Sequence, residues 1–392
     1  RHVARLEVRT GRPGSPGAQG RLVFALAGAG LAGLVASTVL DTTAARSAAS
    51  QDWPPFVLVA GLLLIGLVAD DDGLFRTVGH NLARAAPGGL ALFVGAVAIV
   101  AGVTALLNLD TSVAFLTPVL VYAARSRGEG EAPLLYGCIL LSNAGSLLLP
   151  GSNLTNLIVL GHLHFSGGQF IAHMWAPALA SLSVTAAVIA FTERRSLSTR
   201  TTDLTRAERP VMGIGLLAVL AATVLVVVLQ NPAVPVAAVG VAAIGVRLAT
   251  GKERPRHVAD VLGAPVLAGL FGVAVALGTL GRAWSGPADL LGHLDGWGTA
   301  ALAAVSSVLV NNLPAASLLA ARRPVHPFSL LVGLNLGPNL GVTGSLAWLL
   351  WLRAARTAGA RPSLAKASRL GAIAVPLSMA AAMGALTISG LR

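Results

Sequence analysis

SNAGSLLLPGSNLTNLIVLG, residues 142–161, is the stretch that decides the fold of this chain. It is apolar and long enough to cross a membrane, but Pro150 and Gly151 interrupt it near its middle. Proline removes a backbone donor and glycine relaxes the helical restraint, so we expect the helix to end near Leu149 and to restart near Asn153. Lipid cannot pair free backbone groups, so this break must be paired within the protein or face a water-filled cavity. A kinked spanning helix, in which the polar residues only repair the kink, is the alternative.

The same pattern recurs about half the chain later. Residues 334–353, LNLGPNLGVTGSLAWLLWLR, again combine asparagines, a Gly-Pro break and a Gly-Ser pair that opens an apolar run. A hairpin-like segment precedes each break, LNLDTSVAFLTPVLV at 107–121 and VNNLPAASLLAA at 310–321. A hairpin followed by a broken helix, present twice, is typical of transporters built from inverted internal repeats. Chance similarity between segments rich in alanine and leucine is the alternative.

Composition places the chain among polytopic membrane proteins. Of its 392 residues 55% are hydrophobic and only 11% are charged, which excludes an ordinary soluble domain. The net charge is +12, but the basic residues are strung between apolar segments without interleaved aromatics, so we expect no nucleic-acid partner. The single cysteine, Cys138, excludes an intramolecular disulfide.

We therefore predict an all-α polytopic membrane protein of inverted repeats, each with a re-entrant helical hairpin and a broken transmembrane helix. Its predicted parts are a disordered cytosolic lead at 1–20, a first repeat at 21–191, a basic cytosolic linker at 192–210 and a second repeat at 211–392. The second repeat has one more plain helix than the first, which leaves open whether an N-terminal helix is missing.

Within these parts we expect two hairpins at about 89–125 and 298–322 and two broken helices at 133–163 and 328–353. An amphipathic helix in the membrane interface is expected at 73–86. Plain spanning helices are expected at 22–40, 54–69, 171–191, 211–229, 233–248, 263–281 and 370–389.

The distribution of lysine and arginine predicts the orientation. Most of them fall in segments that would share a side with the N-terminus. The positive-inside rule then predicts a cytoplasmic N-terminus and a C-terminus outside. The distribution of lysine and arginine between the two sides is the same whether each hairpin re-enters the membrane or crosses it twice, so charge does not decide between these two arrangements.

Asp110 is the predicted site of proton or ion coupling. It is the one carboxylate that the predicted boundaries place inside a long apolar region. An intramembrane acid is costly and marks an ion or proton path, or else is paired within the bundle. No basic residue occupies the corresponding interior, which favours a protonatable or ion-binding acid over a buried salt bridge.

The hairpin and break segments resemble the arsenite-permease branch of the ion-transporter superfamily, which also includes divalent-anion/sodium symporters, citrate carriers and some sodium/proton antiporters. The resemblance is carried by NLDTSVAFLTPV, VNNLPA and GPNLGVTGSLAWLLW, and extends from about residue 62 to residue 392. Some relatives have Asn-Asp-Gly where this chain reads Asn108-Leu109-Asp110, which shifts the acid by one residue. The resemblance implies export of arsenite or antimonite across a bacterial-type inner (plasma) membrane, and an associated ATPase subunit is known for the family.

The hairpin tips and helix breaks are expected to converge near mid-membrane, as neutral hydrogen-bonding groups around one acid. Such a wall suits a small neutral polyhydroxyl solute such as As(OH)3, although helix N-termini could also supply partial positive charge. The predicted substrate-binding residues are Asn108, Thr111, Ser112, Asn143, Ser152, Asn153, Thr155, Asn311, Asn312, Asn335, Asn339, Thr343 and Ser345. We predict no metal site and no cofactor.

Together these features predict a secondary active transporter, not an enzyme, that exports arsenite or antimonite in exchange for protons. One alternative is a sodium/proton antiporter or organic-anion (citrate or dicarboxylate) carrier of the same superfamily. Another is a non-transporting membrane scaffold or a decayed permease. The expected partners are the solute, protons and the lipid bilayer, and the sequence leaves an ATPase subunit and a homodimer open.

Overall fold

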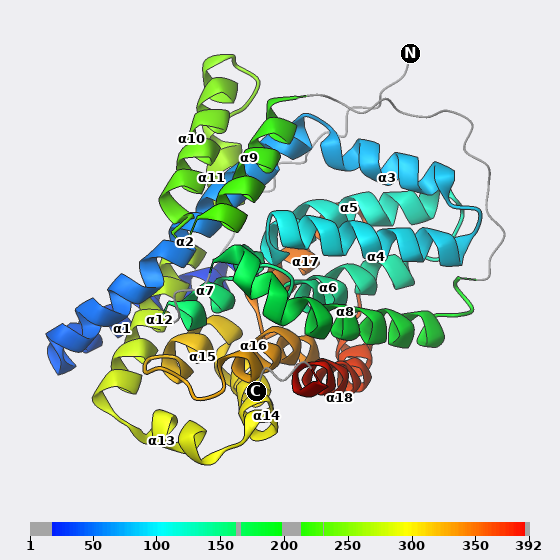
Figure 1. Ribbon diagram of the computed structural model, residues 1–392. Coiled ribbons are helices and arrows are strands. Elements are labelled where there is room, and N and C mark those ends of the chain that lie inside the picture. The colour runs from blue at the N-terminus through cyan, green and yellow to red at the C-terminus, as the bar shows by residue number, and fades with distance from the viewer. Residues whose placement is uncertain (1–17, 162–165, 198–212, 230, 389–392) are drawn as a thin grey trace.

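The computed structural model describes residues 18–161, 166–197, 213–229 and 231–388. All regular secondary structure in this part of the chain is helical, which confirms the predicted all-α class (Figure 1). Most of the predicted lead and most of the predicted linker lie outside the described residues. Residues 18–20, predicted as the end of the disordered lead, instead form the start of the first helix.

Helices joined by short connections make up both halves of the described chain. The first half forms α1 (Ala18–Leu40), α2 (Thr42–Asp71), α3 (Leu74–Ala85), α4 (Gly89–Leu106), α5 (Leu109–Ser126), α6 (Ala132–Gly145), the 3-10 turn η1 (Pro150–Ser152), α7 (Leu154–Leu160) and α8 (Gly167–Thr192). The second half forms α9 (Ile214–Val228), α10 (Ala233–Ala249), α11 (Pro255–Leu262), α12 (Ala264–Ala283), α13 (Gly286–His293), α14 (Gly296–Val310), α15 (Asn312–Leu319), α16 (Pro327–Leu336), η2 (Gly337–Leu340), α17 (Leu346–Thr357) and α18 (Leu364–Ile388).

Six helical segments of the described chain are long and apolar enough to cross a membrane: α1, α2, α4, α8, α11 with α12, and α18. The shorter apolar helices α6, α9, α10 and α14 complete the bundle. The two predicted hairpins are present as α4–α5 and α14–α15, and the two predicted broken helices as α6–α7 and α16–α17.

The first break begins earlier than predicted. Helix α6 ends at Gly145, four residues before Leu149, because the Pro150 ring is incompatible with a helical carbonyl at position 146. The Asn156 side chain instead donates to the carbonyl oxygens of Ser146 and Leu149, at 2.7 and 3.1 Å. The unwound backbone is therefore paired within the protein, and α7 restarts directly after Asn153, as predicted.

The second break is closed by a different side chain. Helix α16 ends at Leu336 and the chain runs through η2 before α17 starts after Ser345. The Trp348 indole nitrogen donates to the Pro338 carbonyl oxygen at 2.8 Å. A tryptophan here does what an asparagine does in the first break.

The prediction for the second spanning helix was wrong at its start. Helix α2 begins at Thr42, not at Pro54, and contains Pro54 and Pro55. The Asp41 carboxylate caps it by accepting the Ala44 backbone N–H at 2.9 Å, which stabilises the start well before the prolines. Two short helices, α11 and α13, were also not predicted.

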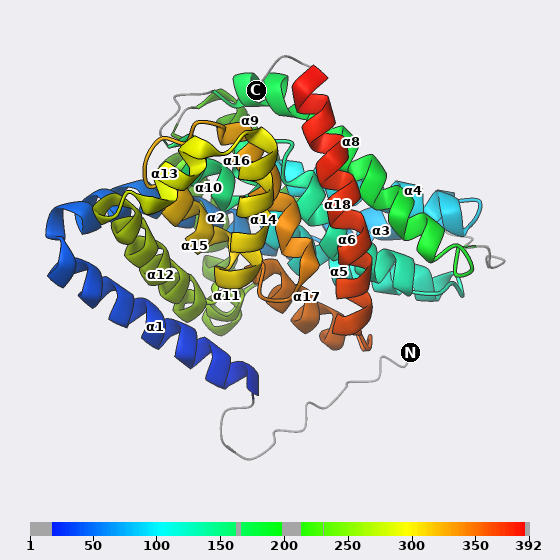
Figure 2. The same cartoon turned by 90° about the horizontal axis from the view of Figure 1, so that it is seen from below.

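The two halves of the chain interleave. Helix α1 packs along α12, α2 along α10, and α8 along α18 (Figures 1 and 2). Glycines permit two of these contacts: a Cβ on Gly30 would collide with the backbone of Gly269, and one on Gly240 with that of Gly61. The short helices α7, α15 and α16 lie in the middle of the molecule (Figure 1), where they position the site.

Candidate functional site

Four helix N-termini converge on one small cavity. Nine of its twelve lining residues come from the starts of α5, α7, α15 and α17, and the others come from α2 and α12. The lining residues are Phe56, Leu109, Asp110, Asn153, Leu154, Leu267, Leu270, Asn311, Asn312, Leu313, Ser345 and Leu346. Helix N-termini present unpaired N–H groups and a partial positive charge, so the arrangement favours oxygen atoms and negative charge.

The cavity is nearly closed and contains one acid. Its volume is about 10 Å³, enough for about one water molecule, so this conformation is occluded. Asp110 lies in the first turn of α5 and is 4% exposed. Among the described residues no hydrogen bond or ion pair engages its carboxylate, and none of the lining residues is basic. The positive ends of the helices therefore provide the favourable field around Asp110.

An asparagine from the second break joins the two broken helices. The Asn335 amide oxygen accepts from the Ser146 hydroxyl and, at 2.7 Å, from the Asn153 amide. Its nitrogen donates to the Asn156 amide oxygen at 2.9 Å and to the Leu331 carbonyl oxygen at 2.8 Å. All four side-chain members are buried, so Asn335 fixes the start of α7 relative to α16.

A second amide contact lies beside the first. The Asn143 nitrogen donates to the Asn339 oxygen at 2.8 Å, and the Asn339 nitrogen donates to the Leu140 carbonyl oxygen at 3.0 Å. Asn143 belongs to α6 and Asn339 to η2. Both polar contacts therefore connect one half of the chain to the other.

The tip of the second hairpin is tied to the second break. Asn311 has φ 75°, the one positive φ outside glycine among the described residues, and asparagine tolerates this conformation better than most side chains. Its amide nitrogen donates to the Thr343 carbonyl oxygen at 3.2 Å, and the Asn312 N–H donates to the Gly344 carbonyl oxygen at 2.8 Å. These bonds place α15 beside the start of α17.

The predicted site residues divide into three groups. Asp110, Asn153, Asn311, Asn312 and Ser345 line the cavity. A second group is buried but does not line the cavity. Its members form the amide contacts, cap helices or pack against neighbouring helices, and they are Asn108, Thr111, Ser112, Asn143, Ser152, Thr155, Asn335 and Asn339.

Thr343 does not belong to the site, because it is exposed and its hydroxyl donates to the Val308 carbonyl oxygen. Several buried polar atoms of the other residues have no hydrogen-bond partner in the described structure: Asn108 Nδ2, Thr111 Oγ1, Asn143 Oδ1, Thr155 Oγ1 and Ser345 Oγ. Such groups are costly to bury unpaired, so a conformation that admits water or solute has hydrogen-bonding capacity available.

Sequence reasoning missed three residues of this region. Ser146 and Asn156 lie within residues 142–161, and their spacing from Pro150 could have indicated a role in pairing the broken backbone. Phe56 of α2 also lines the cavity, and nothing in the sequence around it indicates a site residue.

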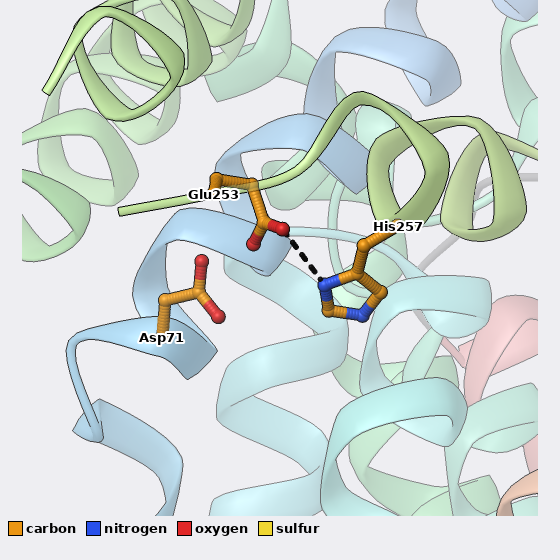
Figure 3. Close-up of side chains that lie close together, drawn as sticks. All are labelled: Asp71, Glu253 and His257. Carbon is orange, nitrogen blue, oxygen red and sulfur yellow. Dashed lines mark hydrogen bonds and ion pairs between the residues drawn. The ribbon is translucent and has the colours of Figure 1, made fainter. Parts of the chain in front are cut away.

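One cluster lies far from this cavity. Asp71 at the end of α2, Glu253 before α11 and His257 on α11 have ligand atoms within 4.8 Å of one another, and the His257 Nδ1 lies 3.1 Å from Glu253 Oε1 (Figure 3). This group was not predicted. It lies about 22 Å along α2 from Phe56, so it takes no part in the cavity.

Comparison with known proteins assigns the family. A family model described as citrate transporter matches residues 18–333. The chain belongs to this family. It is 25% identical over 335 residues to an arsenical pump membrane protein of Escherichia coli, covering 76% of this chain and 78% of that protein. It is also 27% identical over 368 residues to an uncharacterized transporter of Mycobacterium tuberculosis, covering 84% of this chain and 85% of that protein.

Among solved structures, the YdaH transporter of Alcanivorax borkumensis aligns with a TM-score of 0.49 and 16% identity, covering 89% of this chain and 88% of that one. The family match and the arsenical pump relatives confirm the resemblance to the arsenite-permease branch of the ion-transporter superfamily. This citrate transporter family member is thus a multi-pass membrane transporter.

Proposed function

We propose that this citrate transporter family member exports arsenite or antimonite in exchange for protons, with Asp110 as the coupling acid. The observation that carries the proposal is the cavity itself: one carboxylate among three side-chain amides, one hydroxyl and four helix N-termini, with no basic residue among those that line it. Uncharged As(OH)3 offers three O–H donors and three oxygen acceptors, which matches this set of groups.

Competition at one carboxylate would provide the exchange. In its charged form Asp110 accepts a hydrogen bond from a solute hydroxyl, while helix N–H groups and the Ser345 hydroxyl donate to the solute oxygens. When Asp110 takes up a proton, it loses its charge and becomes a weaker hydrogen-bond acceptor, so the solute binds more weakly. The carrier is then loaded with either the solute or the proton, as an antiporter requires.

An organic anion is the second candidate, favoured by the four helix N-termini and by the description of the matching family model. A citrate or dicarboxylate together with the Asp110 carboxylate carries more negative charge than four helix N-termini balance at about half a positive charge each, and no lysine, arginine or histidine lines the cavity. This shortage of positive charge is the reason for placing arsenite first. A sodium/proton antiporter would also use Asp110 but would need no hydroxyl donors.

The same proposal includes the placement of the protein. We place it in a bacterial-type inner membrane, with the N-terminus cytoplasmic and the C-terminus outside. Two inverted repeats would produce helix pairs in which each repeat contributes the partner of the other. The pairs α1 with α12 and α2 with α10 fit this pattern, as do α5 with α17 and α7 with α15. An ATPase subunit and a homodimer remain open partners.

The test compares solutes in one preparation. In everted vesicles, wild-type protein is expected to accumulate arsenite when a proton gradient is applied, and to move sodium and citrate no faster than empty vesicles. Asp110→Asn should lower gradient-driven arsenite transport at least about ten-fold. Asp295→Asn, an exposed cap of α14 that asparagine can replace, is the matched control and should transport normally.

Citrate transport without arsenite transport would replace the first candidate by the second. Normal proton-driven transport and an unchanged pH profile in Asp110→Asn would remove the coupling role of Asp110.

A further inference from the structure

A second buried acid lies about one helical turn from the cavity. Asp52 in α2 is 1% exposed, whereas the predicted helix boundaries had left it outside the membrane. Residues four apart share a helix face, so Asp52 lies on the face of Phe56, which lines the Asp110 cavity. The helical rise separates the two by about 6 Å along the axis, in the direction of the start of α2.

A much larger cavity lies against a different face of α2, along residues 46–58. We call it the vestibule; its volume is about 790 Å³, and α2, α7, α9, α10 and α12 contribute to its wall. Helix α7 separates it from the small cavity, because Asn153 and Leu154 line the small cavity whereas Leu157 and Leu160 line the vestibule. Asp52 itself lines neither cavity: its sequence neighbour Gln51 lines the vestibule, and Phe56, on the same face of α2 as Asp52, lines the small cavity.

A polar cluster is centred on Gln51, the residue before Asp52. Gln51 donates from its amide to the Ile158 carbonyl oxygen of α7 at 2.9 Å and to the Ala320 carbonyl oxygen after α15 at 3.2 Å. Its amide oxygen accepts from the Arg282 guanidinium of α12, and both Gln51 and Arg282 line the vestibule. The cluster thus holds the far ends of two helices whose N-termini form the Asp110 cavity.

Asp52 is not an ordinary ion-pair partner. No contact within 4.0 Å joins it to Arg282 among the described salt bridges, and Arg282 donates instead to Gln51 and to the Gly278 carbonyl oxygen. Ser317 of α15 is its neighbour but donates its hydroxyl to the Leu313 carbonyl oxygen at 3.3 Å, and Asp52 Oδ2 is buried without a partner in the described structure. A buried carboxylate oxygen left unpaired is costly unless it is protonated or engaged in another state.

We propose that Asp52 is a second proton-carrying carboxylate of the transport cycle, exchanging its proton with water in the vestibule on the way to and from the Asp110 cavity. The proposal rests on the proposed proton-coupled function. The proton leaves Asp52 for a vestibule water, and the carboxylate that remains is stabilised by the Arg282 charge. That positive charge disfavours a metal cation at the same place.

Few other charges can contribute to the pH dependence. In the described chain α1 from residue 23, α7, α9 and α15 carry no ionisable side chain, and α12 offers only Arg282. Arg46 of α2 lines the vestibule, and Arg322 donates to the Arg282 carbonyl oxygen. Asp110 lies on α5, which also packs against α2, and Asp41 caps the start of α2. The other charged residues near α2 lie at its far end: on α2 itself, Asp70 and Asp71; on α10, Arg247, which is paired with Asp72; on α3 and α11, Arg76, His80, Arg84, Arg256, His257 and Asp260; and after α10, Glu253.

The test separates solute exchange from proton coupling in proteoliposomes that contain the full chain. Arsenite counterflow at equal pH needs no net proton movement, whereas accumulation driven by a pH gradient does. Asp52→Asn is expected to keep counterflow within about two-fold and to lose gradient-driven accumulation at least about ten-fold, and Asp52→Glu to keep both. Asp41→Asn, the same change at the cap of the same helix, should behave as wild type.

Three outcomes decide the matter. Full gradient-driven accumulation by Asp52→Asn overturns the proposal. A proportional loss in both assays also overturns it, because it shows a structural role. If wild-type protein shows counterflow but no response to a pH gradient, the proposed proton coupling itself fails, and this proposal fails with it.

A second measurement needs no variant. A hydrophobic carbodiimide reacts with protonated buried carboxyls, and peptide mass spectrometry locates the adduct. Labelling of Asp52 in the reconstituted wild-type protein should rise as the pH falls from about 8 to about 6. Labelling that does not change with pH, or none at Asp52 while Asp110 is labelled, contradicts the proposal even if Asp52→Asn fails to fold.

Discussion

Single amide groups hold the centre of this protein together. Asn335 engages Ser146, Asn153 and Asn156 at once, in a region that water does not reach. Asparagine suits this position because its amide both donates and accepts. The Asp110 carboxylate, in contrast, has no protein partner in the described structure. The residue that stabilises the site, Asn335, therefore differs from the residue proposed to bind the proton, Asp110.

Replacing Asn335 should therefore affect stability more than an exposed amide does. Asn335→Leu leaves the Asn153 amide nitrogen and the Asn156 amide oxygen without their partner, whereas the Ser146 hydroxyl keeps the Asn143 carbonyl oxygen. Each buried group left unpaired costs about 1 to 3 kcal/mol, so we expect a loss of at least about 2 kcal/mol. The measurement is thermal unfolding of the purified protein in detergent. Asn231→Leu, at an exposed asparagine of the vestibule, is the matched control and should change little. Equal stability of the two variants would show that the amide contacts are not needed for the fold.

At the scale of elements, the conformation of a helix break depends on the helix that packs directly against it. Helix α18 packs against η2, and a Cβ on Gly371 would collide with the Asn339 carbonyl oxygen. Proline explains why each helix stops. The packing of a neighbouring helix explains why the unwound segment keeps one conformation.

Gly371→Ala should push α18 away from η2 and disturb the second break. Overpacking of this kind costs about 1 to 3 kcal/mol, and solute affinity should fall as well because Ser345 follows the break. Thermal unfolding and arsenite uptake measure the two effects. Gly384→Ala, in the same helix with open space around its Cβ position, should be neutral or slightly stabilising. An unaffected Gly371→Ala would mean that η2 moves freely with α18.

For the whole molecule, two pairs of packed helices indicate that the solute can reach the Asp110 cavity from two opposite faces of the protein. Helices α5 and α17 pack together and extend from the cavity toward one face, where Arg125 donates to the carbonyl oxygens of Ala358 and Gly359. Helices α7 and α15 pack together and extend toward the vestibule, where Gln51 joins their ends. A nearly closed cavity between them is the geometry that alternating access needs.

The single native cysteine allows this arrangement to be tested. Cys138 is fully buried, so a membrane-impermeant maleimide should label the wild-type protein little. Ser50→Cys in the vestibule wall should react in intact cells, and Ser363→Cys before α18 only in everted vesicles, because the two positions lie at opposite faces under the proposed orientation. Labelling of both variants from the same side would refute that orientation.

Local chemistry explains why much of this protein could be predicted from its sequence. The hairpins, both breaks and the asparagines around them follow from where proline, glycine and polar residues interrupt apolar runs, since lipid tolerates such interruptions only where they are paired. The start of α2 did not follow, because an N-cap at Asp41 outweighed two prolines. Asp52 was consequently not recognised as a membrane-embedded acid.

By itself the sequence determined the helical class, the family, the two broken helices and the buried position of Asp110, because each depends on residues near one another in the chain. Only the tertiary structure decided which asparagines line the cavity, which ones join the two halves, and that Asp52 is buried beside a residue that lines the vestibule. Those facts depend on contacts between segments separated by half the chain, and the spacing of residues within one segment does not contain them.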